Sequence, residues 1–300
     1  MRLSDYRDQL NIKILRDGEF DTLGNCTDGI EVSFLSFLGK ERFLDKMSSR
    51  ISCLITTAGL VYKIPESIKG LAVAEDPKLE YVTLHNLLSK EEAYVGKSFA
   101  TIIGKNCDIS PLAVVPKENV IIGDDVTIGP FTVIHERTEI GNRVTIRENC
   151  IIGGKTFNYA TPEGEQLVPM IDCGKVIIED DVDIYGLTYI DSCPLPTETT
   201  RFMKGTQIGA CVHVAHGSQI GEKAMIPCGA DIAGNCRIGS EVFMGPSAVI
   251  SNRITVGDGA HITLGSVVTK NVEPHQTVSG NFAVEHKKFI KEVKSWNSET

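Results

Sequence analysis

A six-residue spacing of bulky aliphatic residues most constrains what this 300-residue chain can fold into. From Ile208 to Val268 such a residue stands at every sixth position, and after the first a smaller or β-branched residue stands two positions before each. Residues spaced by two point to the same face of a strand, whereas six is not a helical period. Short strands wound into stacked coils satisfy this pattern. The repeat therefore predicts a mainly β fold, a parallel β-helix with an apolar interior.

Glycine follows the aliphatic residue in several hexads, for example at Gly209 and Gly245. Glycine adopts backbone conformations that other residues avoid. We expect these glycines to let the chain bend sharply after each strand.

The phase of the repeat indicates the domain organisation. Residues before about Ser98 lack the six-residue phase and alternate short β-like runs with amphipathic helical stretches, which is typical of a small α/β domain. Two excursions, 153–175 and 192–205, interrupt the hexads, and such loops often bind ligands. A short closing helix is expected over Val284–Trp296. The predicted divisions are 1–98 for an N-terminal α/β domain, 99–274 for the β-helix, and 275–300 for a C-terminal linker and helix.

Composition excludes several functional classes. The net charge is −9 and no long run of Lys or Arg occurs, which argues against a nucleic-acid surface. No segment approaches the roughly 20 apolar residues of a membrane span, and the start of the chain is too polar for a signal peptide. The nine cysteines show no CxxC spacing, so we expect reduced core residues and a cytoplasmic location.

Two histidines stand together in VHVAHGSQIG. Because Val212 and Val214 point inward, His213 must point outward and His216 falls on the next corner. Both are candidates for catalysis, with solvent-facing histidines as the alternative. Other histidines lie several coils away in sequence, so we expect no metal site.

Several motifs together resemble the UDP-3-O-acylglucosamine N-acyltransferases of lipid A biosynthesis, over nearly the whole chain. The matching segments are LSFLGKERF at Leu35–Phe43, KTFNY at Lys155–Tyr159, VIIEDDVDIYGLTYID at Val176–Asp191, VAHGSQIG around His216, and ADIAG before Asn235. The resemblance implies a left-handed β-helix, a homotrimer, and an N-terminal domain that binds the nucleotide.

The resemblance also implies roles for individual residues. It assigns the general base to His216, the backbone N–H that meets the oxyanion to Gly234, and the orientation of His216 or of the sugar to Asp191. It implies no permanently bound cofactor. The expected substrate-binding residues are Phe37, Lys40, Phe43, Phe157, Tyr159, His213 and Arg253.

The sequence departs from the family at several positions. Lys40 replaces an asparagine between the uridine-binding aromatics, and Arg253 matches a second histidine of the family. LGSVVTK replaces a methionine-lined acyl tunnel, and the C-terminal helical extension is short. These departures favour acyl- or acetyl-coenzyme A as the donor to the amine of a nucleotide-linked amino sugar for surface glycan synthesis. The alternatives are the lipid A enzyme itself, using acyl carrier protein, and a non-catalytic scaffold.

Overall fold

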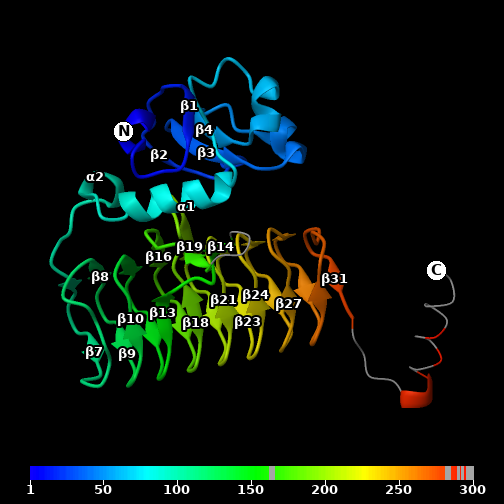
Figure 1. The fold of residues 1–300 in the computed structure, drawn as a ribbon. Coiled ribbons are helices and arrows are strands. Elements are labelled where there is room, and N and C mark those ends of the chain that lie inside the picture. Colours follow the sequence, from blue (N-terminus) through cyan, green and yellow to red (C-terminus); the bar gives the residue numbers. More distant parts are fainter. Residues whose placement is uncertain (162–165, 281–284, 289–290, 292–293, 295–300) are drawn as a thin grey trace.

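The computed structural model describes residues 1–161, 166–280, 285–288, 291 and 294, and it contains an N-terminal α/β part and a long β-helix (Figure 1). The closing helix expected over Val284–Trp296 lies for the most part outside the described residues.

The N-terminal part is built on a five-stranded sheet with the strand order β1-β5-β4-β3-β2. Strands β2 to β5 pair in parallel, and β1 is antiparallel to β5. Strand β4, ISCLIT, is almost continuously buried, as expected for a parallel strand covered on both faces. The elements are η1 Leu3–Tyr6, β1 Lys13–Arg16, β2 Thr22–Leu23, β3 Phe34–Leu38, η2 Glu41–Lys46, β4 Ile51–Thr56, η3 Ala58–Lys63, β5 Gly70–Val73, α1 Pro77–Leu88 and α2 Glu92–Val95.

Helix α1 begins with residue types that favour a helix start. Asp76 accepts hydrogen bonds from the backbone N–H groups of Lys78 and Leu79, and Pro77 occupies the first helical position. The helix contacts β3 and β4 on one side and, on the other, the hairpin of β14 Tyr159–Ala160 and β15 Val168–Pro169. Figure 1 shows α1 between the five-stranded sheet and the coils.

The β-helix has three parallel sheets, one for each face of its coils. Partners in neighbouring coils lie eighteen residues apart, as in Val214↔Ile232 and Ile232↔Ile250, so three hexads make one coil. The first sheet contains β6 Ile102–Ile103, β8 Val120–Ile122, β11 Thr138–Ile140, β16 Lys175–Ile178, β19 Thr199–Phe202, β22 Gln219–Ile220, β25 Arg237–Ile238 and β28 Thr255–Val256. The second contains β7 Asp108–Ile109, β9 Thr127–Ile128, β12 Thr145–Ile146, β17 Asp183–Ile184, β20 Gln207–Ile208, β23 Met225–Ile226, β26 Phe243–Met244, β29 His261–Ile262 and β31 Thr277–Val278. The third contains β10 Val133–Ile134, β13 Ile151–Gly154, β18 Tyr189–Asp191, β21 His213–Val214, β24 Asp231–Ile232, β27 Val249–Ile250 and β30 Val267–Val268.

The aliphatic residues of the hexads form the interior of the coils. Ile208, Val214, Ile220 and Ile232 are all completely buried in one continuous core. Burial of this kind contributes about 25 cal/mol per Å² of apolar surface. The predicted parallel β-helix is therefore confirmed.

The glycines that follow the aliphatic residues have a different role from the expected one. A Cβ at Gly209 would lie 2.5 Å from the backbone nitrogen of Cys228, and one at Gly245 would lie 2.3 Å from that of Leu264. The left-handed backbone at many corners is instead adopted by other residues, including Arg253 with φ +62°. These two glycines are required by the close approach of the next coil, so the expectation that they supply the bend is wrong.

The two excursions attach the N-terminal part to the middle of the β-helix. The first contains the antiparallel hairpin of β14 Tyr159–Ala160 and β15 Val168–Pro169. Ala160 and Met170 of this excursion, with Leu195 of the second, pack into the same hydrophobic cluster as Tyr81 of α1. The loops that leave the coils are thereby fixed against α1, and this junction contains the cavities described below.

All nine cysteines are free thiols, but they are not all core residues. Cys150 and Cys236 are completely buried, whereas Cys211 and Cys228 are exposed. The latter two lie at corners between strands, so the expectation of core cysteines is wrong for them. In the described part of the chain, no helix is long and apolar enough to cross a membrane.

Candidate functional site

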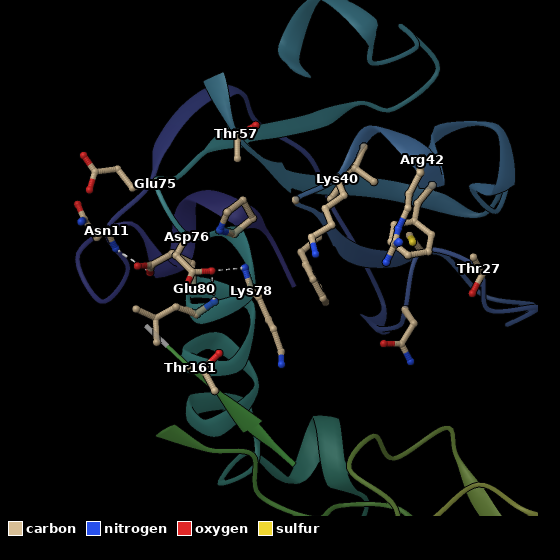
Figure 2. A pocket seen from close by; sticks show the side chains of 18 of the residues that line it. Asn11, Thr27, Lys40, Arg42, Thr57, Glu75, Asp76, Lys78, Glu80 and Thr161 are labelled. Carbon is tan, nitrogen blue, oxygen red and sulfur yellow. Dashed lines mark hydrogen bonds between the residues drawn. The ribbon is translucent and has the colours of Figure 1, made fainter. Parts of the chain in front are cut away.

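The larger cavity, of about 960 Å³, lies between the N-terminal part and the β-helix. Figure 2 shows Lys40 and Arg42 on one side, Asp76, Lys78 and Glu80 from the start of α1 on another, and Thr161 from the first excursion. Phe37, Phe43 and Arg253 also line it. Four of the sequence-predicted residues, Phe37, Lys40, Phe43 and Arg253, are therefore brought together although they lie up to 216 positions apart.

Four cationic and three acidic residues line this cavity. Of the acidic side chains, Asp76 caps α1 and Glu80 accepts a hydrogen bond of 2.9 Å from the Asn11 backbone N–H, whereas Glu75 has no hydrogen bond or ion pair with a described residue. Its cationic residues are Lys40, Arg42, Lys78 and Arg253, none of which forms an ion pair with a described residue. Lysine and arginine side chains of this kind suit the phosphates of a nucleotide.

The two aromatic residues of the cavity are both partly buried. The Arg42 guanidinium carbon lies 4.8 Å from the centre of the Phe43 ring, and the Phe37 ring centre lies 4.9 Å from that of Tyr81. Each ring thus has one neighbour that holds it against the wall. A planar base can stack on an aromatic side chain arranged in this way.

A smaller cavity, of about 130 Å³, adjoins the larger one and reaches His216. Asn25, Phe37, Lys78 and Arg253 line both cavities. The smaller cavity is further lined by Tyr81, Val82, Asn158, Met170, Pro194, Leu195, Glu198 and Asn235. A ligand can therefore extend from the aromatic residues of the N-terminal part to the histidine of the β-helix.

His216 is held at the corner that follows β21. Its carbonyl oxygen accepts a hydrogen bond of 2.8 Å from the Asn235 backbone N–H, and the Gly217 N–H donates to Thr200 Oγ1 at 3.0 Å. The Nδ1 atom of His216 is buried and has no hydrogen-bond partner among the described residues. Burial lowers the pKa of His216, so its imidazole is neutral near pH 7.

Gly234 lies directly against the His216 ring. A Cβ at position 234 would lie 2.9 Å from His216 Nε2. The Gly234 carbonyl accepts from the Arg253 N–H at 3.0 Å, whereas its own N–H donates to no described residue. A neutral imidazole that lines the smaller cavity thus lies next to a glycine with a free backbone N–H, although Gly234 itself lines neither cavity.

His213 has a different environment, on the outer face of the third sheet. Its Nδ1 lies 2.9 Å from Asp231 Oδ1 and its Nε2 lies 3.4 Å from Asp191 Oδ1. These hydrogen bonds, the one with Asp191 first, raise the pKa of His213 to about 9. His213 is therefore a cation at neutral pH and cannot act as a base.

The expected role of Asp191 in orienting His216 is not matched. The Asp191 carboxylate, which is 5% exposed, hydrogen-bonds His213 and has no hydrogen bond with His216. Its charge acts on His216 only through space, where it opposes the effect of burial on the pKa. Asp191 and His213 both lie on the third sheet, and the register Tyr189↔His213 places Asp191 beyond the end of β21, on the side of His216.

The structure does not bring Phe157 and Tyr159 to these cavities. Phe157 is 93% exposed, and its ring packs edge-on against Tyr159 with centres 5.2 Å apart. Neither residue lines the larger or the smaller cavity, although Asn158 and Thr161 from the same excursion do. The expectation of substrate contact is therefore not met by this single chain.

Several residues of the smaller cavity were not found from the sequence. Tyr81 follows the helical pattern of α1 and reads as an ordinary core residue, and Glu198 lies in the TETT run of the second excursion. Asn25 lies twelve positions before Phe37, the first aromatic residue of the Leu35–Phe43 segment that resembles a uridine-binding motif. Only the placement of the excursion loops against α1 brings them together.

Metal binding finds no support within the described residues, because no three His, Cys, Asp or Glu side chains gather as a possible ligand set. The proposed chemistry below uses side chains and backbone alone.

Comparison with known proteins supports the family resemblance. The model for the bacterial transferase hexapeptide, six repeats, matches residues 119–154. The UDP-3-O-acylglucosamine N-acyltransferase of Wolinella succinogenes is 33% identical over 167 residues, which cover 56% of this chain and 52% of that protein. The chain thus matches only about half the length of that relative. The protein of the same name from Campylobacter lari is 28% identical over 304 residues, covering 93% of this chain and 92% of the relative.

The fold also has counterparts among solved structures. The UDP-N-acetylglucosamine acyltransferase from Campylobacter jejuni aligns with a TM-score of 0.55 and 20% identity, over 66% of this chain and 79% of that one. At this identity the likeness concerns the fold alone, which is a left-handed parallel β-helix. Together, these matches show that the chain has a hexapeptide repeat and is similar in sequence to UDP-3-O-acylglucosamine N-acyltransferases.

Proposed function

We propose that this protein transfers an acyl group from a pantetheine thioester to the amine of a UDP-linked amino sugar. One observation carries the proposal. The cationic, aromatic-lined cavity opens beside a smaller one that contains His216, and the two share four lining residues. A nucleotide held in the larger cavity places its sugar near the imidazole.

The chemistry follows from the contacts of His216. The neutral amine attacks the thioester carbonyl carbon while His216 removes a proton from the amine nitrogen, a step worth roughly 10²- to 10⁴-fold. The carbonyl oxygen becomes an oxyanion, which the free N–H of Gly234 can stabilise. Collapse of the tetrahedral intermediate breaks the carbon–sulfur bond, and the leaving thiolate takes the proton back from His216. The products are the amide and the free pantetheine thiol.

The identity of the acceptor rests on the relatives. Both curated relatives described above are named UDP-3-O-acylglucosamine N-acyltransferase. These names favour a UDP-3-O-acylglucosamine acceptor, as in the lipid A enzymes that the sequence resembles, over the glycan enzyme that the departures in sequence favour. They do not name the donor, for which acyl carrier protein and coenzyme A remain the two candidates. We therefore propose a UDP-linked 3-O-acylglucosamine as acceptor, and turnover with each donor separates the two candidates.

Turnover with defined donors tests the proposal. Purified protein is incubated with UDP-3-O-acylglucosamine and either hydroxyacyl carrier protein or acetyl-coenzyme A, and the released thiol is measured. We expect turnover with a thioester, and a loss in kcat of about 100-fold in His216→Ala with nearly unchanged affinity for the nucleotide sugar. His213→Ala is the matched control and should lose less. Equal activity of the two variants contradicts the role of His216, and no turnover with either donor favours a non-catalytic scaffold.

A further inference from the structure

The wall of the smaller cavity contains a buried hydroxyl without a partner. Tyr81 is only 2% exposed, and its hydroxyl oxygen is fully buried and makes no hydrogen bond with any described residue. Its ring packs against that of Phe37, with ring centres 4.9 Å apart. Buried polar groups nearly always have partners in folded proteins. A hydroxyl left free beside a cavity indicates a polar ligand.

A partly buried carboxylate lines the same cavity. Glu198 accepts a hydrogen bond of 3.2 Å from the side-chain amide of Asn25 and a long one of 3.5 Å from the Leu195 N–H. The Asn25 amide is shared, because it also donates to Asp28 at 3.2 Å. Glu198 therefore has hydrogen-bonding capacity that the protein leaves unused.

The charges around Glu198 favour the binding of a cationic group. Burial, and then the nearby Asp28 charge, raises the pKa of Glu198 to about 7. Arg253 acts in the opposite direction through space, yet Glu198 forms no ion pair with any described residue. Lys78, the other cation of the cavity wall, donates from Nζ to the Tyr159 carbonyl at 2.7 Å. A carboxylate that is partly removed from water and has no paired cation carries a desolvation cost, and a positively charged ligand group relieves that cost.

We propose that Glu198 and Tyr81 form the subsite that recognises the sugar amine, with Glu198 pairing with the amine as it arrives in its ammonium form and the Tyr81 hydroxyl bonding a neighbouring hydroxyl of the sugar. This inference rests on the proposed function, because it assigns the acceptor amine to the cavity that contains His216. Both residues are specificity determinants. The bound ammonium first releases one proton to solvent, and His216 then removes the second proton as the neutral amine attacks. A sugar with a hydroxyl in place of the amine lacks the cation that Glu198 pairs with.

Two commercial nucleotide sugars test the role of Glu198 without any turnover. UDP-glucosamine and UDP-glucose differ only in the amine or hydroxyl at one carbon, and isothermal titration calorimetry gives the Kd of each. We expect wild type to bind UDP-glucosamine roughly tenfold more tightly than UDP-glucose, because hydrogen bonds to charged groups are the stronger class. Glu198→Gln should abolish this difference and leave the Kd of UDP alone unchanged. Glu139→Gln, on the outer face of β11, is the matched control and should behave as wild type.

Tyr81→Phe tests the second residue by two measurements, melting temperature and sugar binding. A residue with a purely structural role would not show the expected pair of results. Because the hydroxyl has no partner in the free protein, its removal should leave the melting temperature unchanged or raise it. The same variant should weaken the binding of both nucleotide sugars several-fold and leave that of UDP unchanged. Tyr185→Phe, at an exposed position of the β-helix, is the control. A fall in melting temperature with unchanged sugar binding overturns the role of Tyr81.

The outcomes separate this inference from the proposed function. Amine preference in wild type that persists in Glu198→Gln, or the absence of any preference, overturns the subsite even when thioester turnover is found. A preference that depends on Glu198, without turnover by wild type, supports the subsite and contradicts the acyltransferase activity.

Discussion

At the scale of single residues, two histidines three positions apart have opposite electrostatic environments. Burial lowers the pKa of His216, whereas hydrogen bonds with Asp191 and Asp231 raise that of His213. The hexad predicts this difference in part, because it turns His213 outward and places His216 at a corner. The carboxylates that flank His213 come from neighbouring coils and cannot be seen in the local pattern.

The pH dependence of kcat should report His216. Since its pKa is lowered, the base is unprotonated at pH 7, and we expect kcat to fall only when the pH drops below about 6.5. The quantity to measure against pH is kcat, because kcat/KM also reflects ionisation of the free substrate amine. An acidic limb near pH 9 would instead identify His213 as the base.

Gly234→Ala should reduce catalysis through His216. The added Cβ would lie 2.9 Å from Nε2, so the imidazole must move away from the position it needs for proton transfer. We expect kcat to fall by about 10²-fold while the Kd for UDP stays within twofold. Crystallography of the variant checks the displacement of the ring, and an undisplaced ring with full activity contradicts the argument.

The ion pairs of His213 should stabilise the fold only on the acidic side of pH 9. The pKa is about 9 in the folded protein and near 6.5 in the unfolded one, so the stabilisation is complete below pH 6.5 and is lost as the pH rises through 9. Because the side chain is 43% exposed, we expect about 1 kcal/mol at most. Urea unfolding of wild type and His213→Gln at pH 6 and pH 9.5 measures this difference, which should shrink at the higher pH.

At the scale of elements, the segment from β3 to η2 and the start of α1 form two walls of the larger cavity. The sequence motif around Phe37 and Phe43 pointed to the first wall, and the Asp76–Pro77 helix start is visible in the sequence. That both face one cavity depends on the order of strands in the sheet and on the docking of α1 against β3.

Phe43→Ala should weaken nucleotide binding. Stacking of a base on an aromatic ring contributes about 1–3 kcal/mol, so KM for the nucleotide sugar should rise about tenfold with little change in kcat. Steady-state kinetics measures the change, and circular dichroism confirms that the variant folds. Leu44→Ala, in the same cluster but outside the cavity lining, is the control for lost packing and should leave KM nearly unchanged.

At the scale of the whole molecule, the single chain leaves the large apolar side chain of Phe157 uncovered. This residue projects almost fully exposed from the first excursion. The resemblance implies a homotrimer with sites in the clefts between neighbouring β-helices, which would give Phe157 and Tyr159 a partner surface.

We therefore expect a homotrimer in solution. Analytical ultracentrifugation at micromolar concentration should give a species of three chain masses. In that assembly Phe157→Ser should weaken the trimer, because it removes an apolar contact, whereas the exposed Tyr62→Ser in the N-terminal part should not. A monomer for the wild type contradicts the expectation.

By itself, the sequence determined the parallel β-helix, because a period of six can bury its aliphatic residues only when coils stack. It also placed His216 at a corner of the coil and identified the Leu35–Phe43 segment as similar to a uridine-binding motif. Only the tertiary structure decided that the excursion loops dock on α1, that Glu198 and Tyr81 share a cavity with His216, and that Asp191 pairs with His213. The physical reason is the sequence separation of the contacts. In the β-helix, contacts between neighbouring coils recur every eighteen residues and leave a periodic pattern. The cavities depend on packing between segments more than a hundred residues apart, which leaves no local pattern.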